Sequence, residues 1–207
     1  MYIVLEGIVG SGKSTQSKRL VAYFASLFPE KEILLVREPG STPIAEDIRH
    51  LAQKKEWADE VMHPLTNAYL YAAARAQLLH TIVKPALESR KIVISDRSFL
   101  SSLAQQGFAQ GLWIETVLSI NESAIAGILP DRVLYLDIDS NSALDRSFDH
   151  HGDKWEKMEH SFFDAIIEWY EKCEKLEIMK NRCIRVDAHG SEDEVFQRIQ
   201  SYIDTIL

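Results

Sequence analysis

Basic residues, cysteine and long apolar runs are all scarce in this sequence, and each scarcity excludes a class of protein. Lys and Arg total 23 against 31 Asp and Glu, which gives a formal net charge of −8. A surface that binds duplex nucleic acid needs clustered Lys and Arg to neutralise phosphates, and no such cluster is evident. We therefore expect no nucleic-acid partner, although a few local cations would be enough to hold the phosphates of a nucleotide.

The cysteines and the apolar runs bear on the compartment. Cys173 and Cys183 have neither the spacing of a metal site nor that of a disulfide framework, so we expect thiols in a reducing cytosol. No apolar stretch reaches the ~18 residues that are needed to span a bilayer. The chain also starts on a strand-like run and not on a signal peptide. The expectation is a cytoplasmic protein with no membrane partner.

The order of apolar runs predicts the fold class. The chain has 207 residues, of which 46% are hydrophobic, and this is enough for one sizeable core. Short runs of Val, Ile and Leu without polar alternation suit strands that are buried on both faces. The expected strands are Tyr2–Leu5, Ile33–Val36, Ile92–Ile94, Val133–Leu136 and Cys183–Val186. The expected helices are Lys13–Phe28, Pro43–Gln53, Val61–Ser89, Leu112–Gly127, Trp155–Met179 and Glu192–Ile206. This alternation predicts a single α/β domain over residues 1–207, with helices on both faces of a parallel sheet and ligands beyond the carboxyl ends of its strands.

The first chemical motif is GIVGSGKS, residues Gly7–Ser14, which fits G-x-x-x-x-G-K-[ST]. It lies between an expected strand and an expected helix, the context that a phosphate-binding loop requires. Its glycines let backbone N–H groups converge on phosphates, Lys13 supplies a charge for the β and γ phosphates, and the Ser14 hydroxyl can ligate Mg²⁺. An accidental glycine-rich turn is the alternative, and the full pattern in this context disfavours it.

The second motif is KIVISDRS, in which an expected strand ends at Asp96 and Arg97. A carboxylate there can hold Mg²⁺ directly or through water, and the planar guanidinium beside it suits a phosphate. Alone, the pair could equally be a surface ion pair. Beside a phosphate-binding loop, the functional interpretation is favoured.

Two further motifs carry candidate binding residues, and Arg37 of the first lies at the ligand-binding edge. In VREPGSTPIAEDIR, Arg37 leaves the second strand, and the alternative to a binding role is a salt bridge with Glu38 or Glu46. In YLYAAARAQ, Tyr71 and Arg75 are four residues apart and share a helix face, where a ring and a guanidinium can stack on a base and donate to its carbonyls. Spacing alone favours a core tyrosine and a surface arginine.

A polar segment, DRSFDHHGDKWE, follows the fourth strand and a short helix. We expect a mobile lid over the phosphates at about residues 145–156, with Arg146, His150, His151 and Lys154 as its candidate contacts. A metal site at the two adjacent histidines is disfavoured, because such histidines on an exposed loop are usually solvated.

Taken together, these motifs resemble the thymidylate kinase family, whose members transfer the γ-phosphoryl group of ATP to dTMP to give dTDP. The resemblance extends over nearly the whole chain in order and includes REPGSTPIAEDIR, LYAAARAQ, SDRS, SSLAQQG and DKWE. It implies a three-layer P-loop nucleoside monophosphate kinase fold, with a five-stranded parallel sheet flanked by helices. It also implies Mg²⁺ as cofactor, ATP and dTMP as substrates, and a homodimer.

The resemblance also implies a role for each matching residue. The residues implied to bind ATP are Gly7, Gly10, Ser11, Gly12, Lys13, Ser14 and Thr15. Those implied to bind the acceptor are Arg37, Tyr71, Arg75, Arg97, Ser102 and Gln106, with Tyr71 and Arg75 on thymine and Arg37 and Arg97 on the phosphate. Ser14 and Asp96 are implied to hold Mg²⁺, and the implied catalytic residues are Lys13, Arg97 and Arg146.

The chain also departs from the family pattern. Val9 stands where the family usually has an acid that accepts from the 3′-hydroxyl of the acceptor, and Gln105 stands where a tyrosine often lies against the sugar. Ser98 replaces a common aromatic, and His150 replaces an arginine of the lid. Position 10 is Gly, so the chain resembles the subgroup whose catalytic arginines come from the lid and not from the loop.

Transfer to dTMP is the leading hypothesis, and two alternatives stay open. The departures at the sugar would fit a kinase of another or modified deoxynucleotide monophosphate. The thinned lid would fit a non-catalytic nucleotide-binding protein, although the retention of Lys13, Ser14, Asp96 and Arg97 argues against it.

Overall fold

A computed structural model describes residues 1–54, 60–147, 160–173 and 175–207, and its centre is a five-stranded sheet of order β2-β3-β1-β4-β5. Every neighbouring pair of strands is parallel. The strands are β1 Tyr2–Glu6, β2 Ile33–Arg37, β3 Ile92–Asp96, β4 Arg132–Asp137 and β5 Cys183–Asp187. Each lies within two residues of its expected position, and the α/β prediction is confirmed.

The strands differ in burial more than the sequence suggests. All of β1 is buried, and β3 and β4 are buried over most of their length. The edge strands β2 and β5 are only partly covered, and Leu35 of β2 is 42% exposed. The expectation of burial on both faces is therefore wrong at the two edges, because an edge strand has a neighbour on one side only.

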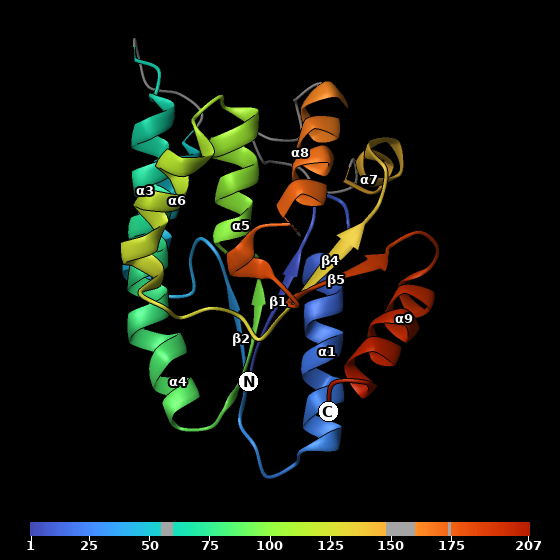
Figure 1. Cartoon of the computed structure of the whole chain (residues 1–207). Coiled ribbons are helices and arrows are strands. Elements are labelled where there is room, and N and C mark those ends of the chain that lie inside the picture. Colours follow the sequence, from blue (N-terminus) through green and yellow to red (C-terminus); the bar gives the residue numbers. More distant parts are fainter. Residues whose placement is uncertain (55–59, 148–159, 174) are drawn as a thin grey trace.

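Helices flank the sheet, and Figure 1 shows α1 and α9 together on one side of it, with α3, α4 and α6 on the other. The α-helices of the described ranges are α1 Lys13–Leu27, α2 Pro43–Gln53, α3 Pro64–Leu78, α4 Lys84–Glu88, α5 Phe99–Ser102, α6 Ile114–Ile125, α7 Ser140–Ser147, α8 His160–Cys173 and α9 Glu192–Asp204. None of them combines the length and the apolar character that a bilayer-spanning segment needs.

Two long predicted helices differ from the structure. The helix expected over Val61–Ser89 is α3 and α4, joined by a π-helical segment at Leu79–Val83. We attribute this segment to Pro85, because proline lacks an N–H and crowds the turn before it. In the segment Trp155–Met179, the described part contains α8 and a 3₁₀ turn at Glu177–Met179, while Trp155 itself lies outside the described residues.

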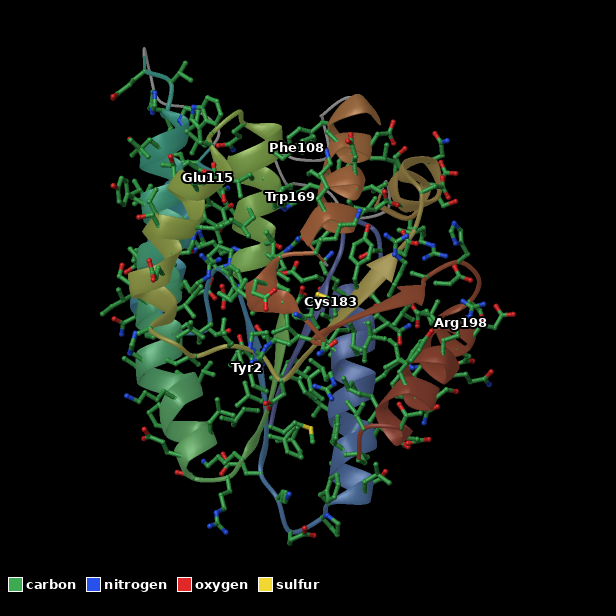
Figure 2. The ribbon with its side chains drawn as sticks, viewed as in Figure 1. Tyr2, Phe108, Glu115, Trp169, Cys183 and Arg198 are labelled. Carbon is green, nitrogen blue, oxygen red and sulfur yellow. The ribbon has the colours of Figure 1, made fainter. Side chains whose placement is uncertain are left out.

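The helical region after β3 was not expected. It consists of α5 and a π-helical segment at Leu103–Ala109, and α8 packs against that segment. Phe108 of the segment stacks on Trp169 of α8, with ring centroids 6.1 Å apart. Both residues are labelled in Figure 2. This contact holds α8 beside the π-helical segment.

Strand register brings the chemical motifs to one edge of the sheet. Leu5 of β1 pairs with Asp96 of β3, and Asp96 pairs in turn with Arg37 of β2. The phosphate loop follows β1 directly, so the loop, Asp96 and Arg37 leave neighbouring strands at the same end. The expectation that ligand-binding residues lie beyond the carboxyl ends is met in the geometry.

The phosphate loop touches α7 closely at Gly10. This residue has φ +79°, and a Cβ placed on it would lie 1.9 Å from the carbonyl oxygen of Ala143 in α7. Gly12 has a similar φ of +91°, but a Cβ there would meet nothing within 4 Å. Both residues need the left-handed region that favours glycine, and only Gly10 also needs the missing side chain for contact.

We predict that Gly10→Ala destabilises the protein more than Gly12→Ala does. Both substitutions carry the left-handed penalty of ~1–2 kcal/mol. Gly10→Ala adds a collision with backbone, which we expect to cost a further ~1–3 kcal/mol. Urea unfolding without nucleotide measures both, and equal midpoints would contradict the close contact with α7.

Candidate active site

The phosphate loop places a buried cation at its centre. Lys13, the first residue of α1, is 6% exposed, and its Nζ donates to the Ile8 carbonyl oxygen at 2.6 Å and to Ser11 Oγ at 3.3 Å. Burial and the nearby Arg97 lower the pKa of Lys13 to about 7, although Asp96 and Glu6 oppose this shift. An anion beside Lys13 would favour its charged form, so the loop is suited to a phosphate.

A cleft of ≈ 680 Å³ opens over this loop. Its wall includes loop residues 9–16, the carboxyl ends of β2 and β3, and residues 190–192 after β5. Among the described residues, five cationic side chains line it, namely Lys13, Arg37, Arg49, Arg97 and Arg146. On a chain of net charge −8, this local collection of cations fits a polyanion such as a nucleotide phosphate.

Ser14 and Asp96 form the oxygen-rich part of the cleft. Ser14 follows Lys13 in α1, and its Oγ donates to Asp96 Oδ2 at 2.6 Å. The described residues contain no group of three or more His, Cys, Asp or Glu side chains that could enclose a metal. A hydroxyl with one carboxylate suits Mg²⁺, which prefers oxygen ligands and usually completes its shell with water and substrate phosphates.

Two of the predicted phosphate-binding arginines face the cleft. Arg97 has a left-handed backbone, with φ +79°, and its Nη1 donates to the Gly7 carbonyl oxygen at 3.2 Å and to Ser101 Oγ at 3.1 Å. Arg37 donates from Nη2 to both carboxylate oxygens of Glu46 at 3.0 Å. The salt bridge considered as its alternative role is therefore present, but the Arg37 side chain is 52% exposed and lines the cleft as well.

Arg49 is a cleft residue that the sequence motifs did not single out. It lies in α2, and its Nη1 donates to the Pro39 carbonyl oxygen at 2.9 Å. It closes the same VREPGSTPIAEDIR run that begins beside Arg37, and α2 brings it back toward the cleft. Because Arg49 is the last cation of a run that was already assigned to the binding edge, its place in that run could have marked it as a cleft residue.

The predicted base-binding residues form a buried cluster beside the cleft. Tyr71 is 4% exposed and Arg75 is 2% exposed, so the alternative of a core tyrosine holds and that of a surface arginine is wrong. Arg75 Nε donates to Glu38 Oε2 at 2.6 Å. The other acceptors of its guanidinium are the Ser98 carbonyl oxygen, Ser102 Oγ and Asn121 Oδ1.

Glu38 joins this cluster to the cleft. It is 4% exposed, lines the cleft and pairs with Arg75. Burial raises the pKa of Glu38, and the charge and hydrogen bond of Arg75 oppose that shift. Tyr71, Arg75, Ser102 and Gln106 themselves are not among the residues that line the cleft. Gln106 is fully buried, and its Nε2 donates to Asn67 Oδ1 at 3.1 Å.

Arg146 lies near the end of α7 and faces the loop after β5. Its Nη1 donates to the Ala188 carbonyl oxygen at 3.0 Å, and its Nη2 donates to that of Gly190 at 2.9 Å. Arg146 therefore supports the loop that forms one wall of the cleft. His150, His151 and Lys154 of the expected lid lie outside the described residues.

Comparison with known proteins identifies the relatives of this chain. The profile of the thymidylate kinase family matches residues 5–199. The thymidylate kinase of Finegoldia magna is 42% identical over 200 residues, which cover 96% of this chain and 95% of that protein. The thymidylate kinase of Halothermothrix orenii is 38% identical over 203 residues, covering 96% and 94%. Among solved structures, the thymidylate kinase of Ehrlichia chaffeensis superposes with a TM-score of 0.77 at 27% identity, over 99% of this chain and 98% of that one.

We predict that Arg75→Met lowers the free energy of unfolding by ~3–5 kcal/mol, even without substrate, because it leaves Glu38 buried without its cation. Arg37→Met is the matched control, since its pair with Glu46 is exposed and should cost at most ~1 kcal/mol.

A second substitution should restore part of the stability that Arg75→Met removes. Adding Glu38→Gln to Arg75→Met should recover part of the lost stability, because the uncompensated charge is removed. Urea titration of the four proteins measures this. An Arg75→Met midpoint equal to that of Arg37→Met would refute the structural role of the pair.

Proposed function

The chain belongs to the thymidylate kinase family, whose members are ATP-dependent kinases that phosphorylate dTMP to dTDP, and on that premise we propose how its residues divide this work. The observation that carries the proposal is the cleft of ≈ 680 Å³, in which the phosphate loop and four arginines of the described residues line one space. Phosphoryl transfer depends mainly on alignment and on neutralising charge, and such a cleft supplies both.

The phosphate loop is the proposed ATP site. The residues in this role are Gly7, Gly10, Ser11, Gly12, Lys13, Ser14 and Thr15. Lys13 binds the β and γ phosphates, and the two oxygens to which its Nζ donates, the Ile8 carbonyl oxygen and Ser11 Oγ, are neutral. Ser14 and Asp96 hold Mg²⁺, which neutralises charge on the phosphates when it is bound, and their 2.6 Å contact supports this role because it brings two oxygen donors together.

Arg97 and Arg37 are the proposed clamp for the dTMP phosphate. A phosphate oxygen of dTMP attacks the γ phosphorus, the bond from that phosphorus to the β–γ bridging oxygen breaks, and ADP leaves with the electron pair. The acceptor is already an anion near neutral pH, so no strong general base is needed. Arg146 completes the charge neutralisation from the proposed lid at about residues 145–156, whose closure would exclude water.

Thymine recognition is the proposed role of the buried cluster beside the cleft. Its residues are Tyr71, Arg75, Ser102 and Gln106. Glu38 supports this assignment, because it lines the phosphate cleft and pairs with Arg75. A base next to Arg75 would thus extend from a phosphate held in the cleft.

We also propose a homodimer that assembles through α3 and α6. A second groove, of ≈ 460 Å³, runs between these helices and is lined mainly by Ala and Ser, with Tyr69 at its side and 57% exposed. Small residues allow another helix to approach closely.

Because ATP and dTMP are cytoplasmic metabolites, we propose the cytoplasm as the compartment.

We predict that dTMP is the preferred acceptor and that Lys13→Ala lowers kcat/KM by at least ~10²-fold, because a charge that stabilises the transition state is lost. Coupled ADP release with dTMP, dUMP and dCMP measures the preference. Lys18→Ala, an exposed change on the same helix, is the control and should leave turnover unchanged.

Three outcomes would overturn this assignment. Near-normal turnover in Lys13→Ala would remove the proposed mechanism. A kcat/KM for another acceptor far above that for dTMP would change the substrate. ATP binding with no transfer to any monophosphate would indicate a binding protein instead of an enzyme.

We further predict that the enzyme discriminates only weakly between acceptors with and without a 3′-hydroxyl, because Val9 lines the cleft with an apolar side chain. A site that hydrogen-bonds a hydroxyl can reject the analogue lacking it by ~10⁴-fold, while apolar fit gives at most ~200-fold. The ratio of kcat/KM for dTMP to that for 3′-deoxy-dTMP should stay within the apolar range. Val9→Asp should raise this ratio and Val9→Leu should not; a high ratio in the unmodified protein would contradict the prediction.

A further inference from the structure

The carboxylate of Glu6 lies fully buried directly before the phosphate loop, at the end of β1. It accepts four hydrogen bonds, each of 2.7 Å. Oε1 accepts from the backbone N–H and the hydroxyl of Ser98, and Oε2 accepts from the hydroxyls of Ser101 and Tyr170. These donors come from the segment after β3 and from α8, so one carboxylate joins three parts of the fold.

The directions of these hydrogen bonds connect Tyr170 to Arg97. Burial and the charge of Glu6 raise the pKa of Tyr170 well above its ordinary value, so the phenol keeps its proton and donates to Glu6. The single proton of the Ser101 hydroxyl also goes to Glu6, which leaves the Ser101 oxygen to accept from Arg97 Nη1 at 3.1 Å. Tyr170 and Ser101 thus share one oxygen of Glu6, and their hydroxyl oxygens are 3.3 Å apart.

The ring of Tyr170 is held as firmly as its hydroxyl. It is 3% exposed and stacks on Tyr135 of β4, with ring centroids 4.7 Å apart and an angle of 27° between the rings. The preceding residue of α8, Trp169, stacks on Phe108, and both residues are labelled in Figure 2. The Tyr170 hydroxyl is therefore presented to Glu6 and Ser101 from a ring with little freedom to move.

We propose that Tyr170 is a positioning residue for the acceptor phosphate, because its hydroxyl fixes Glu6 and Ser101 and thereby the guanidinium of Arg97. This inference rests on the proposed role of Arg97 in holding the dTMP phosphate. Arg97 has a long side chain, and its hydrogen bonds in the structure are to the Gly7 carbonyl oxygen and to Ser101 Oγ. Loss of the Tyr170 hydroxyl frees Glu6 Oε2 and the Ser101 hydroxyl to rearrange, and Arg97 then loses its alignment. The position of α8 is in this way coupled to the phosphate clamp.

Tyr170→Phe tests the proposal, because it removes one oxygen and keeps the stacked ring. We expect kcat/KM for dTMP to fall by about 10-fold, with KM for ATP changed less than twofold. Calorimetric affinities for dTMP and thymidine isolate the phosphate contact, since only dTMP reaches Arg97. The ratio of the affinity for dTMP to the affinity for thymidine should fall by about 10-fold, while the affinity for thymidine stays unchanged.

Tyr23→Phe is the matched control, since it also removes a hydroxyl that donates to a carboxylate. The Tyr23 hydroxyl bonds Asp204 at 2.5 Å, on helices away from the phosphate loop, and its removal should leave both the affinity ratio and kcat/KM unchanged.

A double-mutant cycle separates positioning from a general structural effect. In an Arg97→Met background, Tyr170→Phe should cause no further loss of dTMP affinity. An undiminished loss in that background, an unchanged dTMP-to-thymidine affinity ratio, or an equal effect on ATP and dTMP would each overturn the proposal.

If Tyr170→Phe folds poorly, Ser101→Ala removes the hydroxyl that lies between Glu6 and Arg97 in the hydrogen-bond network. It should give the same change in the affinity ratio. Failure of the unmodified protein to phosphorylate dTMP would instead overturn the proposed function.

Discussion

The active-site end of this protein is organised around the buried negative charge of Glu6. An ionised carboxylate without partners in a protein interior costs several kcal/mol, so its surroundings must supply donors and cations. Ser98, Ser101 and Tyr170 supply the hydrogen bonds, and Lys13 and Arg97 lie within electrostatic reach. The two cations that balance Glu6 from one side line the cleft on the other. A structural requirement of the core and the attraction of phosphate thus depend on the same charges.

A second buried acid lies after β2, which β3 separates from β1 in the sheet. Glu38 follows β2 and pairs with Arg75 of α3, and it too lines the cleft while its partner lies in the cluster behind. Parallel strands deliver both carboxylates to one edge of the sheet, because all carboxyl ends of such a sheet point the same way. Strand direction therefore brings two buried acids, each with an arginine nearby, to the same edge of the sheet, one from β1 and one from β2 on either side of β3.

The sequence predicts the parts of this protein that depend on local pattern, and it misses those that depend on tertiary contact. The run at Ile92–Ile94 is apolar without alternation, so β3 was identifiable, and the spacing within Gly7–Ser14 specifies the loop by itself. Arg75 looked exposed, because a lone arginine on a helix usually is, and its burial depends on partners 37 and 46 residues away. Glu6 gave no signal, since one acid at a strand end does not reveal the hydroxyls that surround it. The π-helical segment at Leu103–Ala109 likewise has no simple sequence pattern.

The contact between Gly10 and Ala143 bears on how such enzymes diversify. The backbone of α7 fills the space that any side chain at position 10 would need, and α7 is also the helix that carries Arg146. A mutation that put arginine into the loop would displace that helix before it could contribute any charge. With Arg146 in its proposed role, an arginine at position 10 would therefore compete for space with the helix that carries Arg146. On that proposal, the residue tolerated at position 10 depends on where the backbone of α7 lies.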